Sequence, residues 1–277
     1  MKAPARVALA AGLTAAVPLA WLAVTQPSLE RAWSPDHAQL PRAVFDGDTV
    51  RLSGVRHFSY GRRGEVRPAY ASRTLDLSRL ESVWFVLVPL SARLRAPAHS
   101  FVTFGFADSQ YVGISVEARR EVGETYGVIA GLFRRYELIY VVADERDLLT
   151  RRVLHDGAEV YLYPIRASRD KVRELFVAML GRTNQLAERP EFYNTAVNNC
   201  TSNLVAHVNA IAPGRIPAGI RTVLPGYADE VALELGLIEG GATLEAVRRR
   251  FRASERVARH AEAADFSRRI RDVAERR

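Results

Sequence analysis

Residues 190–204 read PEFYNTAVNNCTSNL, a stretch that ends one helix and begins the next. Pro190 closes an amphipathic helix predicted from about Ser168 to Glu188, where apolar residues recur at three- and four-residue spacing. After the pair Asn198-Asn199, the run CTSNLVAHVNAI predicts a second, shorter helix. The only cysteine of the chain, Cys200, therefore stands at the start of a helix.

The rest of the chain predicts a mixed α+β domain over residues 45–241. Six segments rich in β-branched and aromatic residues precede the cysteine helix and are bounded by Gly, Asp or Pro, so each is expected to be a strand. They are Val50–Tyr60, Ser82–Leu90, His99–Phe106, Val112–Val116, Glu137–Val142 and Glu159–Ile165. A further helix is expected from about Tyr227 to Leu237, beyond a loop rich in Pro and Gly.

The N-terminus predicts a membrane segment. Val7 to Val24 is an uncharged run of 18 residues that follows Lys2 and Arg6, and such a helix is about 27 Å long, close to the hydrocarbon thickness of a bilayer. Basic flanks stay cytoplasmic, so residues 1–26 are expected to be a single-pass inner-membrane anchor that places the remaining chain in the periplasm. A cleaved secretory signal is the alternative. Residues 27–44 are expected to be a linker.

The formal net charge of +8 is unevenly distributed. Residues 244–277 hold eleven Arg against six acidic residues, which leaves the rest of the chain only mildly basic. No basic stripe with interleaved aromatic residues occurs in the centre, so nucleic acid is not an expected partner. The segment 242–277 is predicted to be a basic helical tail, which either attracts anionic headgroups or packs as a helix on the domain.

Cys200 is the candidate nucleophile. A lone cysteine in an exported chain cannot form an internal disulfide, and a helix start favours the thiolate form. Its base must be a histidine, and His99 is the best candidate because it begins an alternating strand after a loop. His207 lies too far along the same helix, and His37 falls in the predicted linker.

A third group usually orients the imidazole of such a pair. Glu117 is the first candidate and Asn199 the second, although Asn198 and Asn199 are equally suited to act as turn and cap residues or to line an oxyanion site. The histidines lack ligand spacing and no HExxH motif or cysteine pair is present, so neither a metal nor another cofactor is expected.

Several of these segments resemble the Lnb N-terminal periplasmic domain family, which is associated with bacterial lipoprotein N-acyltransferases. The resemblance covers about Val44 to Leu237 and rests on VRHFSYG, HSFVTFGF, ISVEARRE, YELIYVVADERD, VYLYP and above all PEFYNTAVNNCTSNL. It implies a circularly permuted papain-like (NlpC-type) fold, with the catalytic thiol at Cys200 and the histidine at His99. His57 departs from the family, where Asn is expected.

The resemblance implies acyl transfer through a thioester on Cys200, from a phospholipid donor to a lipoprotein or another amine acceptor at the membrane. Two alternatives remain at this stage. One is a papain-like cysteine peptidase or amidase of the cell envelope, which would have a polar, open groove rather than an apolar cleft beside the cysteine. The other is a non-catalytic envelope binding module in which Cys200 is an inert core residue.

Overall fold

The computed structural model describes residues 25–61, 64–241 and 243–272. Their centre is an eight-stranded sheet. Seven of its strands follow the order β1-β2-β9-β8-β7-β6-β10, and the eighth, β5, pairs with β2. Every adjacent pair is antiparallel except β2 and β9. The strands are β1 (Arg42–Asp46), β2 (Thr49–Arg56), β5 (Tyr70–Asp76), β6 (Leu80–Pro89), β7 (Ala98–Phe106), β8 (Tyr111–Arg119), β9 (Glu137–Asp144) and β10 (Tyr161–Pro164). A small second sheet pairs β3 (Ser59–Tyr60) with β4 (Val66–Arg67).

The mixed α+β class is confirmed, and a strand is present in each of the six segments where the sequence predicts one. The predicted helices correspond to α3 (Arg169–Glu188), α4 (Cys200–Ile211) and α6 (Ala228–Glu234). The other helices are α2 (Glu145–Thr150), which continues into a π-helical turn η4 (Arg151–His155), α5 (Ile220–Val223), α7 (Leu244–Phe251), α8 (Ser254–Arg259) and α9 (Phe266–Arg269). Short 3₁₀ turns occur at η1 (Pro35–His37), η2 (Leu77–Arg79), η3 (Ala130–Leu132) and η5 (Pro225–Tyr227).

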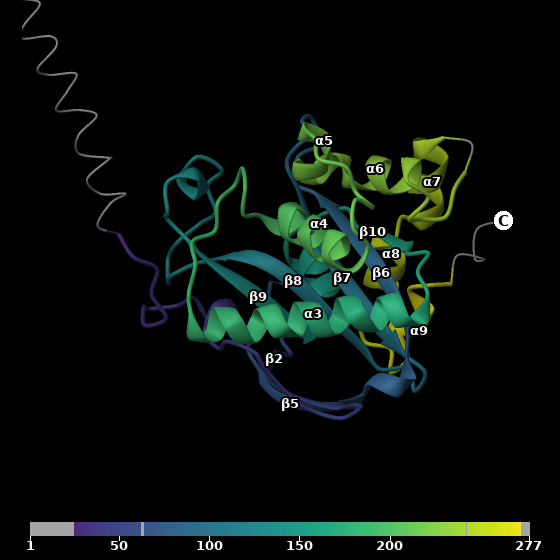
Figure 1. Ribbon diagram of the computed structural model, residues 1–277. Helices are drawn as coiled ribbons and strands as arrows, with labels where there is room; N and C mark the ends of the chain where they lie inside the picture. Colours follow the sequence, from purple (N-terminus) through teal and green to yellow (C-terminus); the bar gives the residue numbers. More distant parts are fainter. Residues whose placement is uncertain (1–24, 62–63, 242, 273–277) are drawn as a thin grey trace, which may run out of the picture.

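Helices cover both faces of the sheet. In Figure 1, α3 and α4 cross one face, and the second core cluster places α8 and α9 against the other. The alternation of β7 sends Phe104 to the first face, where its ring lies 4.8 Å from that of Phe176 in α3, and sends Phe101 to the second face. The sheet is therefore buried on both sides, which explains why its central strands are apolar at nearly every position.

The C-terminal segment contributes to both cores. Val247 and Phe251 belong to the core that includes α3 and α4, and Val257, Phe266 and Ile270 belong to the second core. Val247, Phe251, Val257, Phe266 and Ile270 are all buried. Of the two roles that the sequence left open for residues 242–277, packing on the domain is the one that the described residues 243–272 adopt.

Residues 25–44 also lie against the domain rather than away from it. Trp33 forms a bridge with Glu121, and its ring lies 3.9 Å beneath the guanidinium of Arg119. His37 is only 1% exposed. The predicted linker thus contributes a buried side chain to the folded unit.

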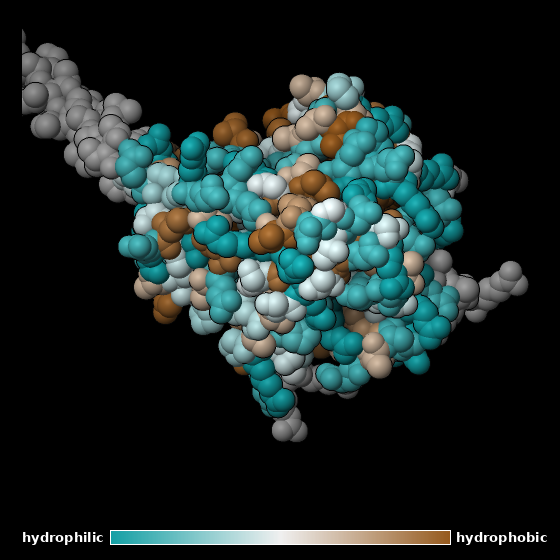
Figure 2. Space-filling model, turned by 60° about the horizontal axis from the view of Figure 1, so that its bottom comes forward, coloured by the Kyte–Doolittle hydropathy of each residue, from teal (hydrophilic) through white to brown (hydrophobic). Residues whose placement is uncertain are grey.

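Within the described part of the chain, no helix has the length and apolar character needed to span a bilayer. The segment predicted to do so, Val7 to Val24, lies outside the described residues. On the face shown in Figure 2, hydrophilic side chains cover most of the surface and hydrophobic ones form small separate groups.

The two strands that carry the predicted site separate at one end. β7 pairs with β6 along its whole length, from Ala98 to Phe106, but it pairs with β8 only between Phe101 and Gly105. His99 and Glu117 lie beyond the last β7–β8 pair, Phe101 with Ser115. The separation leaves room for side chains at this end of the sheet.

Candidate active site

A cavity of about 420 Å³ opens where β7 and β8 separate. Cys200, His99 and Glu117 all line it, so the structure brings together the three residues that the sequence singled out as nucleophile, base and orienting group. Most of the remaining wall is apolar or aromatic, from Leu90, Ala96, Pro97, Ala98, Val116, Ala118, Tyr126, Val128, Tyr193, Leu224 and Pro225. Its polar part consists of Arg120, Arg151, Arg152, Thr195 and Asn199.

Cys200 is the first residue of α4, as predicted. It is 2% exposed, and its Sγ lies 3.8 Å from Oγ1 of the adjacent Thr201. No hydrogen bond joins this sulfur to His99 among the described residues, but the two side chains share one cavity. The backbone N–H of Cys200 likewise has no acceptor in the described part of the chain, so it remains available to an oxyanion formed beside the sulfur.

The two asparagines before Cys200 hold the helix start in place. Oδ1 of Asn199 accepts hydrogen bonds from the backbone N–H groups of Thr201 and Ser202, both at 2.9 Å, and Ser202 Oγ completes a capping box. Asn198 accepts a hydrogen bond from Nδ2 of Asn203 and donates one to the carbonyl of Phe192. The sequence left open whether these asparagines act as cap and turn residues or line an oxyanion site. Their hydrogen bonds are those of cap and turn residues, and among the described residues neither forms a hydrogen bond with His99.

His99 is oriented through Ser115. The hydroxyl of Ser115 donates to Oε1 of Glu117 at 2.8 Å, so its oxygen accepts a hydrogen bond from Nε2–H of His99, also at 2.8 Å. This arrangement fixes the tautomer of His99 and leaves the lone pair of Nδ1 free to take a proton. Glu117 therefore orients the imidazole through an intervening hydroxyl rather than directly.

The charges around Glu117 keep it ionised. Burial alone would raise the pKa of Glu117, but a hydrogen bond from His37 and the charge of Arg152 hold that pKa well below its usual range. Nε2 of His37 lies 3.2 Å from one carboxylate oxygen, and the guanidinium of Arg152 lies 3.3 Å from the other. Nδ1 of His37 accepts the backbone N–H of Arg120, so Nε2 is the nitrogen that donates to Glu117.

Burial and the nearby charge of Arg152 lower the pKa of His99 to about 3. The imidazole is thus uncharged at neutral pH, which is the protonation state that a general base requires. The negative charge of Glu117 opposes this shift, and it would stabilise the imidazolium once a proton had been transferred. The site holds a neutral base beside a fixed negative charge.

Three of the residues in this network were not identified from the sequence. Ser115 lies two positions before Glu117 and so on the same face of β8, a relationship that the strand period could have revealed. His37 and Arg152 come from segments distant in sequence, and Arg152 lies in the π-helical turn η4, which no sequence pattern predicted. Only the fold shows that they meet Glu117.

The other histidines lie outside the cavity. His57 is 53% exposed at its side chain and pairs with Asp144, and Nε2 of His207 lies 2.9 Å from the hydroxyl of Tyr140. His155 pairs with its neighbour Asp156. Among the described residues, no group of three His, Cys, Asp or Glu side chains is arranged to hold a metal ion.

The comparisons with known proteins give a family but no individual relative. No curated protein matches the chain, and no solved structure matches it. The model of the Lnb N-terminal periplasmic domain family matches residues 67–226, which is more than half of the chain. The matched range includes Cys200, His99, Ser115, Glu117 and Arg152, and it indicates a periplasmic domain associated with the cell envelope. The chain belongs to the Lnb N-terminal periplasmic domain family.

Proposed function

We propose that this protein is a membrane-anchored thiol acyltransferase, with Cys200 as nucleophile and His99 as general base. The observation that carries the proposal is the shared cavity, in which a cysteine at a helix start and an oriented, uncharged histidine face a mostly apolar wall. The histidine lies on a strand that precedes the helix of the cysteine. This order agrees with the circularly permuted papain-like fold that the family resemblance implies. The apolar wall favours a lipid acyl group over a peptide, because a peptide needs polar partners along its backbone.

The surroundings of the cavity also favour a lipid substrate. Three of its lining residues, Leu90, Tyr126 and Val128, belong to the large apolar side chains that the surface exposes. Tyr126 and Val128 lie in the loop of residues 126–133, here called the exposed apolar loop. This loop also carries Ile129, which is 73% exposed, and Phe133, which is 48% exposed. Exposed apolar residues grouped at the opening of a cavity are typical of a surface that meets a membrane.

The loop also lies next to the start of the described chain. A guanidinium nitrogen of Arg134 lies 3.5 Å from the carbonyl oxygen of Thr25, directly after the predicted membrane segment. A helix that ended near Thr25 would bring the exposed apolar loop, and with it the opening of the cavity, close to the bilayer. The active site would then meet phospholipid acyl esters where they are concentrated.

The proposed reaction has two steps. In the first, the Cys200 sulfur attacks the carbonyl carbon of a phospholipid acyl ester, and Nδ1 of His99 takes the thiol proton. The backbone N–H of Cys200 supports the oxyanion, and the departing lysophospholipid oxygen takes the proton from His99 as the thioester forms. In the second, a lipoprotein amine attacks the thioester, its proton passes to His99, and the thiol returns as the amide is released.

Incubation of the purified full chain with phospholipid labelled in its acyl group tests this proposal. We expect an adduct on the protein that hydroxylamine removes, no adduct with Cys200→Ser, and strongly slowed adduct formation with His99→Ala. His57→Gln is the matched control, because that histidine lies outside the cavity. A wild-type protein that forms no adduct, or whose thiol resists alkylation until the protein unfolds, would contradict the proposal. If His99→Ala keeps full turnover, another group is the base.

A further inference from the structure

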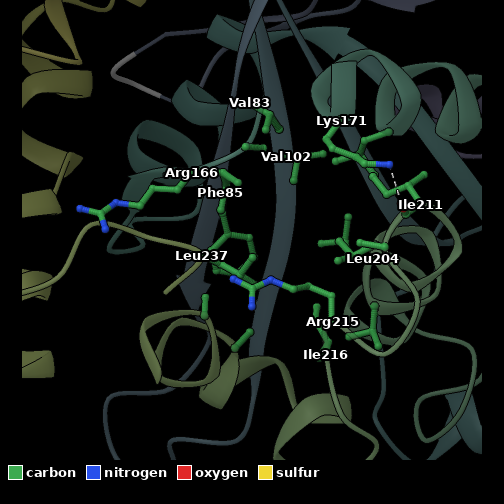
Figure 3. Close-up of a pocket in the computed structure, with 18 of the residues that line it drawn as sticks. Val83, Phe85, Val102, Arg166, Lys171, Leu204, Ile211, Arg215, Ile216 and Leu237 are labelled. Atoms are coloured by element: carbon green, nitrogen blue, oxygen red, sulfur yellow. Dashed lines mark hydrogen bonds between the residues drawn. The ribbon is translucent and has the colours of Figure 1, made fainter. Parts of the chain in front are cut away.

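A second cavity, of about 340 Å³, lies between α3, α4, α6 and the sheet. Its volume is in the range of about 300–1,000 Å³ that small-molecule sites occupy. Most of the wall is apolar: Val83, Phe85 and Val102 come from the sheet, Leu204, Val205, Val208 and Ile211 come from α4, and Val231 and Ala232 come from α6. Figure 3 shows Val102, Leu204 and Leu237 directed toward the same space.

The charged residues of this cavity are all basic. They are Arg166, Lys171 and Arg215, and no Asp or Glu lines it. Lys171 is compensated, because its ammonium pairs with Glu174 at 2.7 Å. Arg215 is exposed and donates to the carbonyl of Leu235 at 2.6 Å, without a carboxylate partner in the described part of the chain. Its side chain extends across the cavity toward Leu237, whereas Arg166 points away (Figure 3).

Consecutive residues at the start of α4 line this cavity and the candidate active site. Thr201 lines this cavity, while the preceding residue, Cys200, lines the catalytic cavity. The Thr201 hydroxyl lies 3.8 Å from the Cys200 sulfur and 3.1 Å from Oγ of Ser100. A molecule held in the apolar cavity would therefore end close to the proposed nucleophile.

We propose that this cavity binds one acyl chain of an anionic phospholipid, with the phosphate of the headgroup on Arg215. An apolar wall suits a hydrocarbon chain, and a guanidinium without a carboxylate partner suits a phosphate. The link to catalysis rests on the proposed function: a phospholipid has two chains, so one can be held here while the ester of the other reaches Cys200. Binding itself needs no chemistry and can be measured alone.

The test uses the full chain carrying Cys200→Ser and phosphatidylglycerol with a photoactivatable diazirine in its acyl chain. After irradiation and digestion, mass spectrometry maps the labelled residues. We expect labels on Leu204, Val208 and Val231, and weaker labelling by the corresponding phosphatidylcholine. Arg215→Ser should weaken labelling by phosphatidylglycerol about tenfold, the usual size of a lost hydrogen bond to a charged group. Arg67→Ser, at an arginine 81% exposed on its side chain and outside the cavity, is its control.

Two matched variants on one helix test the cavity directly. Val208→Trp fills it and should strongly reduce labelling, whereas Ala206→Trp adds the same side chain at an exposed position of α4 that does not line it. If the full chain that carries only Cys200→Ser shows no labelling on α4 or α6, the proposal is overturned. This outcome does not depend on whether Val208→Trp folds. Equal labelling by the two lipids would overturn the assignment of an anionic headgroup. Equally strong competition by free palmitate would overturn the assignment of a phospholipid.

The outcome is separable from that of the proposed function. Labelling of the cavity without an acyl adduct on the wild-type protein would support the lipid site and reject the transfer chemistry. An adduct without labelling of α4 or α6 would support the chemistry and reject this cavity as the place where the chain is held.

Discussion

The imidazole of His99 donates its Nε2 proton to the hydroxyl of Ser115 across 2.8 Å. Because that hydroxyl in turn donates to Glu117, the serine transmits the orientation of a buried carboxylate to the histidine without bringing the two into direct contact. The distance from His99 Nε2 to the nearest carboxylate oxygen is 3.7 Å. Ser115 is thus a positioning residue for the proposed base.

Replacing Ser115 with alanine should lower kcat for acyl-adduct turnover by about tenfold to a hundredfold, with little change in KM, because a slightly misplaced catalytic group loses rate rather than substrate affinity. Steady-state kinetics with labelled phospholipid measure both constants. Ser115→Thr keeps a hydroxyl and should restore most of the rate. A purely structural role would predict instead that the alanine variant loses stability while the active fraction keeps its kcat.

Replacing Glu117 with glutamine should destabilise the fold by about 3–5 kcal/mol, since it leaves the buried Arg152 and His37 without their shared carboxylate. Urea unfolding followed by circular dichroism measures the change. Glu121→Gln is the matched control, because its ion pair with Arg31 is partly exposed and should contribute about 1 kcal/mol or less. Equal losses in the two variants would show that the charge of Glu117 is not needed for folding.

The stability of the protein should fall as the pH decreases below 6.5. Burial lowers the pKa of His99 to about 3 in the folded state, from an ordinary value of 6.5, so the unfolded chain binds the extra proton between these two values and acid favours unfolding. His37 and His207 shift in the same direction, chiefly through burial. Unfolding free energies measured from pH 7 to 4 should therefore decline, and His99→Gln should flatten the curve by at most about 1.4 kcal/mol per pH unit.

Placing a charge in the exposed apolar loop should slow the reaction with membranes but not the chemistry. Ile129→Asp is expected to reduce the rate of adduct formation from phospholipid vesicles, because a carboxylate is costly to bury at a bilayer surface. The rate with a short-chain soluble ester should stay unchanged. Val44→Asp, at a position 60% exposed on β1, is the control. A parallel loss in both variants, or a loss with the soluble ester, would contradict a membrane role for the loop.

The parts of the fold that could be predicted from the sequence are those with a strong local pattern. The apolar run of β6, the alternation of β7 and the three- and four-residue spacing of α3 each identify an element without reference to the rest of the chain. β1 and β5 were missed because each exposes much of its surface, so neither has the apolar content that signals a buried strand.

The site was predictable only in part for a similar reason. The sequence drew attention to Cys200 because it is the only cysteine and starts a helix, and to His99 because it lies at the start of a strand. His37 was excluded because it falls in a segment rich in Pro and charge, yet that segment folds back and buries the ring against Glu117. Contacts of this kind depend on the path of the chain in space, which local periodicity does not contain.

The second core depends on residues that are synthesised after all the strands. Much of the cover on one side of the sheet comes from Ala253, Val257, Phe266 and Ile270, which follow every strand of the sheet in the sequence. A nascent polypeptide that has been synthesised only through β10 still lacks these residues, so its sheet remains poorly covered on that side until they have been made. A premature stop before Leu244 should consequently yield an aggregating product, even though every residue of the proposed site would be present.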